Sequence, residues 1–282
     1  MQEAEQIIEA VEAMTIRGAY LNAVRALEAL VLLTKEASDI NGVTLQQDLL
    51  FAAERLASAN PSWAVVGTAC SFTTAPLREQ PDRQWEVYEI QEMISTRARI
   101  FEEGITQAQD TVTDVGARVV QDGSTIILMS YSLTMVEMLR KAWESGKRFS
   151  VIGTESRPNY EGHEMAERIV KIGVPYTLIT DAALSHFVEG ADMGLIGVDT
   201  LLGNGDVINK IGTLPMALAC KFFGKPLYAI TSSFKISIPS LNGERVGLKV
   251  VDDVAGIAPD ELLDYQNLRV ENLFFEVTPA HL

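Results

Sequence analysis

Cysteine and histidine are scarce in this sequence. Of its 282 residues, 2 are cysteine and 3 are histidine. Cys70 and Cys220 lie far apart and fit no zinc-ligand spacing, and the histidines are scattered. We therefore expect no metal site and no disulfide. Both cysteines stand among apolar neighbours, which indicates small buried side chains rather than reactive thiols.

Long apolar runs and an excess of positive charge are also absent. No stretch of eighteen apolar residues occurs, so we expect no membrane span, and the acidic, amphipathic start is not a secretory signal. The chain has 38 Asp and Glu against 23 Lys and Arg, a formal net charge of -15. Such a surface repels phosphate backbones, which argues against direct binding of nucleic acid. We expect a soluble, cytoplasmic protein.

The glycine fingerprint of dinucleotide-binding enzymes is missing as well. No G-x-G-x-x-G motif follows the first predicted strand, which disfavours a nicotinamide- or flavin-dependent oxidoreductase. We expect no cofactor. What the chain does have is 47% hydrophobic residues over 282 positions, enough for one large domain or two ordinary ones.

The first part of the chain has a helical pattern. Apolar residues recur every three or four positions from Ala4 to Lys35, with a break at 17–19, and again over Leu45–Ser58 and Trp85–Arg118. This period is that of amphipathic helices. We predict a helical N-terminal domain over residues 1–121.

After Asp122, short β-branched runs alternate with helical patterns. This alternation predicts an α/β fold, a Rossmann-like parallel sheet with helices on both faces, over residues 122–282. In such a sheet the functional loops follow the carboxyl ends of the strands. A Gly-rich segment over 238–256 is expected to be irregular. The predicted strands are Thr125–Met129, Phe149–Thr154, Pro175–Ile179, Gly194–Val198 and Leu227–Ile230; the predicted helices are Leu133–Ser145, Glu161–Lys171, Ala182–Glu189 and Leu214–Phe223.

A cluster of polar residues follows the fourth predicted strand. Asp199 stands at the strand end, a glycine-bearing loop follows over 201–206, and Asn209 and Lys210 precede a helix. Backbone N–H groups at that helix start, together with Lys210, could hold a phosphate. Alternatively, the segment is a tight turn shaped by Asn and Asp, with Thr213 as the helix N-cap.

Three weaker signals lie elsewhere. Arg157 follows the second predicted strand and could bind a carboxylate or phosphate, or form a surface salt bridge. Ser130 follows the first strand, but no histidine has a suggestive spacing and no G-x-S-x-G occurs, which favours a hydrogen-bond donor or a helix cap over a nucleophile. In Arg17-Gly18-Ala19, the glycine would let the backbone approach a ligand beside an arginine, although most such tripeptides simply break a helix.

Together these segments resemble the family that contains the alpha, beta and delta subunits of translation initiation factor 2B and two sugar-phosphate isomerases. Those isomerases act on methylthioribose-1-phosphate and ribose-1,5-bisphosphate. The resemblance covers nearly the whole chain, and the segments 147–151 and 233–235 are most similar to the alpha subunit. It rests on Arg17-Gly18-Ala19, Glu155-Ser156-Arg157-Pro158, Gly162, Gly197-Val198-Asp199, Asn204-Gly205-Asp206, Asn209-Lys210-Ile211-Gly212-Thr213 and Phe275-Glu276-Val277-Thr278-Pro279.

The resemblance implies a site in an interdomain cleft and a homodimer formed through the sheet domain. In the isomerases it implies an aspartate acid/base at position 199 and a cysteine where this chain has Ser130. The residues that it assigns to the sugar phosphate are Arg17, Gly18, Ala19, Asn209 and Lys210, to which we add Arg157 as a candidate.

Two departures from the isomerase pattern lead to two hypotheses. Ser130 lacks the thiol that would move a proton readily, and Asn60 stands where the isomerases tend to carry arginine. The first hypothesis is an initiation-factor-like protein that binds a phosphorylated sugar or nucleotide without converting it. The second is an aldose-1-phosphate to ketose-1-phosphate isomerase that uses Asp199, a residue that the alpha subunit usually lacks.

Overall fold

The computed structural model describes residues 2–37, 40–248 and 257–282. The chain forms two compact units, one of Met1–Ala108 with Ser233–Val246 and one of Gln109–Ser232 with Gly247–Leu282. The long helix α5 (Val87–Val119) runs from the first unit into the second. In this division residues 109–121 belong to the second unit, and the domain boundary after residue 121 stays a prediction from the sequence pattern.

The first unit is helical. Its helices alternate apolar and polar residues with the period that the sequence shows, so each buries one stripe. The buried stripes consist mainly of alanine and leucine, as in α2, where Ala23, Leu27 and Leu30 are buried. The helices are α1 (Gln2–Glu12), α2 (Ala19–Lys35), α3 (Gly42–Ala59), α4 (Ala64–Glu79), the first part of α5, and the short η2 (Ser233–Lys235) and α10 (Ile238–Leu241).

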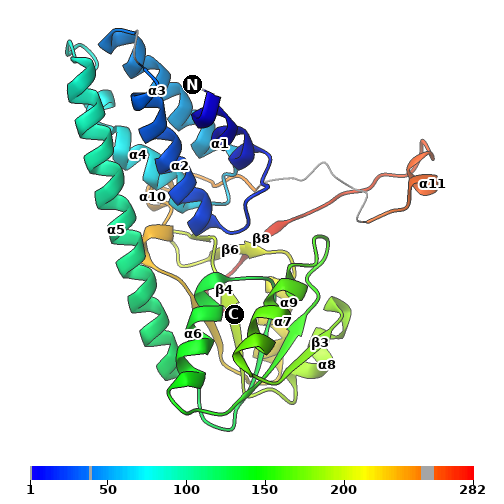
Figure 1. The fold of residues 1–282 in the computed structure, drawn as a ribbon. Coiled ribbons are helices and arrows are strands. Elements are labelled where there is room, and N and C mark those ends of the chain that lie inside the picture. The colour runs from blue at the N-terminus through cyan, green and yellow to red at the C-terminus, as the bar shows by residue number, and fades with distance from the viewer. Residues whose placement is uncertain (1, 38–39, 249–256) are drawn as a thin grey trace. The chain divides into compact units, whose positions relative to one another are not determined.

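The second unit contains a five-stranded parallel sheet with the strand order β3-β2-β1-β4-β7 (Figure 1). Every strand predicted from the β-branched runs is present, with its ends within one residue of the prediction. The strands are β1 (Thr125–Leu128), β2 (Ser150–Thr154), β3 (Tyr176–Ile179), β4 (Met193–Gly197) and β7 (Leu227–Ile230).

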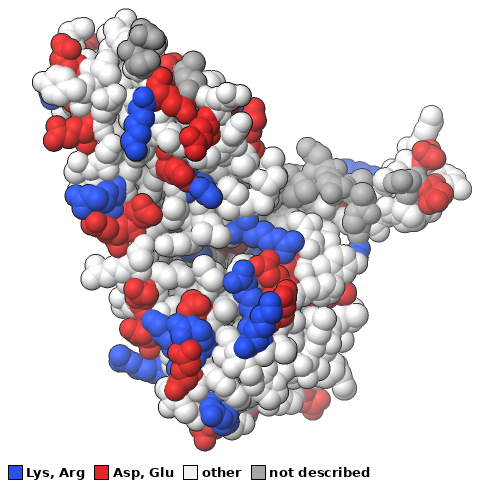
Figure 2. All heavy atoms as spheres, viewed as in Figure 1, with Lys and Arg blue, Asp and Glu red and all other residues white. Residues whose placement is uncertain are grey.

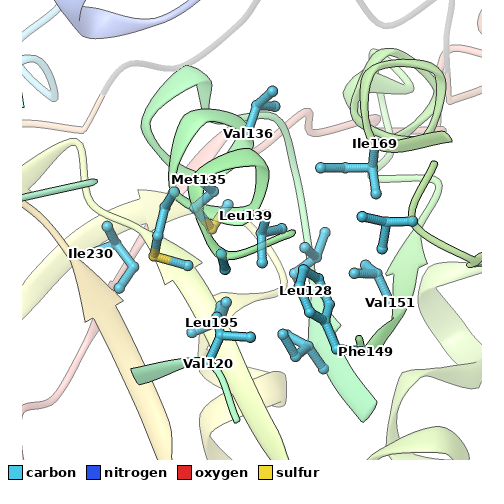
Figure 3. Packing of buried hydrophobic residues seen from close by; sticks show 14 of the residues in the cluster. Val120, Leu128, Met135, Val136, Leu139, Phe149, Val151, Ile169, Leu195 and Ile230 are labelled. Atoms are coloured by element: carbon cyan, nitrogen blue, oxygen red, sulfur yellow. The ribbon is translucent and has the colours of Figure 1, made fainter. Parts of the chain in front are cut away.

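Helices cover both faces of this sheet, as the alternating pattern predicted. Side chains of β1 alternate between the faces: Ile126 and Leu128 pack against α6 (Leu133–Glu144) and α7 (Glu161–Ile172), as Figure 3 shows for Leu128. Ile127 packs on the other face with α8 (Leu184–Val188), which follows the 3₁₀ turn η1 (Asp181–Ala183), and with α9 (Thr213–Phe222). The predicted α/β fold class is confirmed.

A second, antiparallel sheet was not predicted. It consists of β5 (Thr200–Leu201), β6 (Val207–Lys210) and β8 (Phe275–Thr278) in the order β5-β6-β8. The sequence pattern predicts a glycine-bearing loop over 201–206 and no strand beside it, because β6 pairs mainly with β8, which lies far away in the chain. Residues 249–256, part of the segment expected to be irregular, lie outside the described residues, and α11 (Asp260–Leu263) follows them.

Charges of both signs are interspersed over α6 and α7 (Figure 2). Several pair within one helix, such as Arg140 with Glu144 and Arg168 with Glu164. Among the described helices, none is both long and apolar enough to cross a membrane. Cys70 lies in the first unit and Cys220 in the second. Both are free thiols, and both are buried, as predicted.

Candidate functional site

Polar residues gather at the carboxyl edge of the parallel sheet. Ser130 follows β1, Arg157 follows β2, Asp181 follows β3 and Asp199 follows β4. These four strands are neighbours in the sheet, so the loops that carry these residues meet at one edge. Three of the predicted residues, Ser130, Arg157 and Asp199, therefore lie at this edge, and Asp181 lies there as well.

The antiparallel sheet brings Asn209 and Lys210 to the same edge. The backbone N–H of Asp199 donates to the carbonyl of Ile208, at 2.9 Å, which joins the end of β4 to β6. A methyl group built on Gly197 would lie 3.5 Å from the Cβ of Ser132 and 3.8 Å from Oδ1 of Asn209. The loop after β1, the end of β4 and the end of β6 therefore adjoin one another.

Lys210 is a buried cation. Its side chain is 3% exposed, its ammonium donates to Oε1 of Glu161 at 3.1 Å, and Nζ lies 3.3 Å from the centroid of the Phe274 ring. Burial lowers the pKa of Lys210 below its ordinary value, and the nearby charges of Glu161, Asp181 and Asp199 only partly offset this effect. The ammonium is thus paired with one carboxylate, that of Glu161, and is influenced by the charges of two others.

Glu161 is the main site residue that the sequence analysis missed. It lies in the first turn of α7, where an acidic residue is usually explained by the helix dipole. Its Oε2 atom is buried and has no hydrogen-bond partner among the residues that the structure describes. A buried, unpaired carboxylate oxygen is costly, so this atom is suited to accept a hydrogen bond from a ligand.

The start of α9 does not offer the phosphate cradle that the sequence suggested. Oε1 of Glu276 accepts from the backbone N–H groups of Gly212 (2.6 Å) and Leu214 (2.9 Å), so a carboxylate of the chain already occupies that helix end. The N-cap is Gly212, with φ 99°, rather than Thr213. Thr213 instead accepts from Nδ2 of Asn209 at 3.0 Å. Lys210 therefore does not share a phosphate with this helix start.

The glycine-bearing loop before β6 is a tight turn. Oδ1 of Asn204 accepts from the backbone N–H of Asp206 at 3.1 Å, and its Nδ2 donates to the Asp206 carboxylate at 2.8 Å. Both hydrogen bonds join residues of the loop itself, as in the tight turn shaped by Asn and Asp that was the alternative to a phosphate-binding loop.

Ser130 has a strained backbone. Its φ of 63° is in the left-handed region, which costs a residue other than glycine about 1–2 kcal/mol. Ser156 has the same conformation, with φ 61°, and its Oγ accepts from the backbone N–H of Ser130 at 2.7 Å. Strained residues concentrate at functional sites, and Ser130 is only half-buried.

Arg157 is held at both ends. Its backbone N–H donates to Oδ2 of Asp181 at 2.7 Å. Its guanidinium lies over the ring of Tyr160, 4.7 Å from the centroid, and donates to the phenol oxygen. Tyr160 is partly exposed and stacks on His163.

A cavity of about 370 Å³ adjoins these loops. It is mostly apolar, and Asp181 is its only charged lining residue among the described residues. The lining residues are Met129, Asp181, Ala182, Leu184, Ser185, Gly212 and Pro215. No cluster of three or more potential metal ligands occurs in the described part of the chain.

The remaining predicted residues belong to the first unit. Arg17 precedes Gly18, which has φ 88° and is the N-cap of α2, and Ala19 is the first residue of that helix. The buried Asn22 donates to the Gly18 carbonyl at 2.9 Å and so holds this segment. Asn60 is also buried, and its Oδ1 accepts from the N–H of Ser62 at 3.0 Å, so it shapes a turn there.

The fold and its edge site define a Rossmann-like α/β protein whose ligand site would lie at the carboxyl ends of the parallel strands. The profile of the Initiation factor 2 subunit family matches residues 15–282. The chain belongs to this family.

Relatives with different names are similar over nearly the whole chain. A protein of Archaeoglobus fulgidus named ribose 1,5-bisphosphate isomerase is 33% identical over 279 residues, 99% of this chain and 86% of that protein. A Pyrococcus horikoshii protein named putative translation initiation factor eIF-2B subunit 2-like is 31% identical over 278 residues, 98% of this chain and 91% of its own length. The crystal structure of a Pyrococcus horikoshii translation initiation factor eIF-2B superposes with a TM-score of 0.83 at 28% identity, covering 99% of this chain and 92% of that one.

Proposed function

We propose that this protein binds a phosphorylated sugar at the carboxyl edge of its parallel sheet and does not convert it. The observation that carries the proposal is the convergence of Asp199, Asn209 and Lys210 beside the half-buried Ser130. An ammonium has three donor hydrogens. One serves Glu161, which leaves donors for a phosphate or hydroxyl oxygen of the ligand.

The pairing of Lys210 with Glu161 favours a sugar phosphate over inorganic phosphate and over a nucleotide bound by its phosphates alone. The Oε2 atom of Glu161 is buried and has no hydrogen-bond partner among the described residues, and a phosphate placed against it would bring a second negative charge next to the carboxylate. A sugar hydroxyl can donate to that oxygen and accept from Lys210 at the same time.

We propose that the protein does not convert its ligand because it has Ser130 in place of a cysteine. The resemblance places a cysteine at this position in the isomerases, and a serine hydroxyl is a far weaker acid/base than a tuned thiol. Serine preserves a polar group at the strand end while removing the group that would move the proton.

Binding is tested by thermal unfolding with added ligand. We expect ribose 1,5-bisphosphate or methylthioribose-1-phosphate to raise the melting temperature, because a ligand that binds only the native state stabilises it. Inorganic phosphate at the same concentration should have a much smaller effect. If neither sugar phosphate raises the melting temperature up to millimolar concentration, the proposal is wrong.

An isomerase is the second candidate, favoured by the identity of 33% to the protein named ribose 1,5-bisphosphate isomerase and by Asp199. In that case Asp199→Asn should keep ligand binding and lose turnover by about 10²-fold or more, the usual contribution of one acid/base group. Ser130→Cys should raise the rate. A binding-only protein would change affinity alone in Asp199→Asn and gain little or no activity from Ser130→Cys.

We also propose that the protein is a homodimer in the cytoplasm. Leu218 and Phe222 lie one turn apart on α9 and are 51% and 83% exposed. Contiguous exposed apolar patches mark surfaces that another chain covers, and we propose that this pair belongs to the dimer interface. Sedimentation at micromolar concentration should show a dimer, and a well-ordered monomer there would contradict this proposal.

The proposed location in the cytoplasm is supported by the two free cysteines, which fit a reducing compartment.

A further inference from the structure

We propose that Ser156 and Asp181 are positioning residues that hold Ser130 in place for the ligand, through hydrogen bonds that run along the carboxyl edge of the sheet. This inference rests on the proposed function, because it takes Ser130 to contact the bound sugar phosphate. Neither Ser156 nor Asp181 needs to touch the ligand.

The hydrogen bonds begin at Asp181, directly after β3. Both oxygens of its carboxylate accept backbone hydrogen bonds from the loop after β2: Oδ1 from Ser156 at 2.9 Å and Oδ2 from Arg157 at 2.7 Å. Hydrogen bonds to an ionised carboxylate are stronger than those between neutral groups. A two-pronged contact of this kind fixes the orientation of the loop as well as its position.

Ser156 connects the loop after β2 to the loop after β1 by a hydrogen bond. Its Oγ accepts from the backbone N–H of Ser130 at 2.7 Å and lies 3.0 Å from Oγ1 of Thr154. Ser156 and Thr154 are each 1% exposed, so water does not compete for these bonds. An N–H left without its acceptor in such surroundings is costly.

The backbone geometry shows why such support is needed. Ser130 and Ser156 both have φ in the left-handed region, at 63° and 61°. A serine keeps this conformation only where surrounding contacts enforce it. These contacts join the loops that follow β3, β2 and β1, which are neighbouring strands in that order. Without them, Ser130 would relax toward an ordinary conformation and its Oγ would move.

Ser156→Gly separates the hydroxyl from the backbone conformation. Glycine adopts positive φ without strain, so the variant should fold, but it lacks the acceptor for the Ser130 N–H. We expect Ser156→Gly and Ser130→Ala each to weaken the affinity for ribose 1,5-bisphosphate about tenfold by calorimetric titration, the size of one lost hydrogen bond to a charged or buried partner. Ser145→Ala, at the far end of α6, is the control and should leave the affinity unchanged.

The double variant Ser130→Ala/Ser156→Gly decides between positioning and a general structural role. If Ser156 acts through the Ser130 hydroxyl, the double variant should lose about tenfold in total, because the second change has nothing left to disturb. An independent structural effect would multiply, giving about a hundredfold loss. Asp181→Asn, which keeps one acceptor oxygen, should show the same dependence on Ser130.

The outcomes separate this inference from the proposed function. A hundredfold loss in the double variant, or an unchanged affinity in folded Ser156→Gly, overturns the positioning role while sugar phosphate binding stands. An unchanged affinity in Ser130→Ala removes Ser130 from the ligand site and overturns the inference at its base. A wild-type protein that binds no sugar phosphate overturns both.

Discussion

Glu161→Ala is expected to lower the free energy of unfolding by about 3–5 kcal/mol, the usual cost of removing one partner of a buried ion pair. Lys210 is 3% exposed, and Glu161 is the acid that hydrogen bonds to its ammonium. With alanine at position 161, the charge remains in the interior without its hydrogen-bonded carboxylate, against the Phe274 ring and within the influence of Asp181 and Asp199. Chemical denaturation of the two proteins measures the difference.

A matched control lies on the same helix. Glu167 pairs with Lys171 on the surface of α7, where both side chains are more than half exposed. Exposed pairs contribute about 0–1 kcal/mol, so Glu167→Ala should have little effect. Equal losses in the two variants would contradict the assignment of Lys210 and Glu161 as a buried pair.

The pH dependence of Glu161→Gln gives an independent reading of the same pair. Burial already lowers the pKa of Lys210, and Glu161 is the largest opposing influence. Without that carboxylate the native-state pKa falls further, while the unfolded-state pKa stays near its ordinary value. The unfolded state then binds more protons than the native state, so the stability of the variant relative to wild type should rise as the pH increases toward the ordinary pKa of lysine, about 10.4.

The second large effect concerns ligand affinity. Lys210→Ala should weaken the binding of ribose 1,5-bisphosphate roughly 10- to 150-fold, which corresponds to the loss of a hydrogen bond from a charged donor, about 1.5–3 kcal/mol. Calorimetric titration measures this change. Lys171→Ala, which removes an exposed lysine from α7, is the control for the overall loss of one positive charge.

Removing Lys210 alone also leaves the Glu161 carboxylate buried without its partner. The double variant Lys210→Gln/Glu161→Gln avoids this problem, because it replaces the pair by two neutral amides of similar size. It should fold and still bind ribose 1,5-bisphosphate weakly. Wild-type affinity in this double variant would remove Lys210 from the site.

The parallel sheet was predictable because its central strands β1, β2 and β4 are largely buried on both faces. Such strands are short, nearly continuous β-branched runs, and Thr125–Leu128 and Ser150–Thr154 are typical. The antiparallel sheet was not, since Ile208 pairs with Val277 far along the chain, and no local pattern records that partner.

The grouping of some candidate site residues was predictable for a related reason. Ser130, Arg157 and Asp199 could be placed together because they follow neighbouring parallel strands. Glu161 could not, since an acid in the first turn of a helix is ordinary, and only the burial of Lys210 against it shows otherwise. Asp181 could not be predicted either. Its carboxylate accepts two hydrogen bonds from backbone N–H groups, and because almost every residue type has such a group, the sequence around the donors carries no signal.

Nuclear magnetic resonance of the wild-type protein with each of two candidate ligands tests the central claim most directly. Ribose 1,5-bisphosphate and methylthioribose-1-phosphate would each be incubated with the protein, and the ³¹P and ¹³C resonances followed over time. We predict that the ligand resonances broaden or shift on binding and that no ketose appears. Turnover of either compound above about 1 s⁻¹, the low end for ordinary enzymes, would contradict the account and establish an isomerase that works without the cysteine.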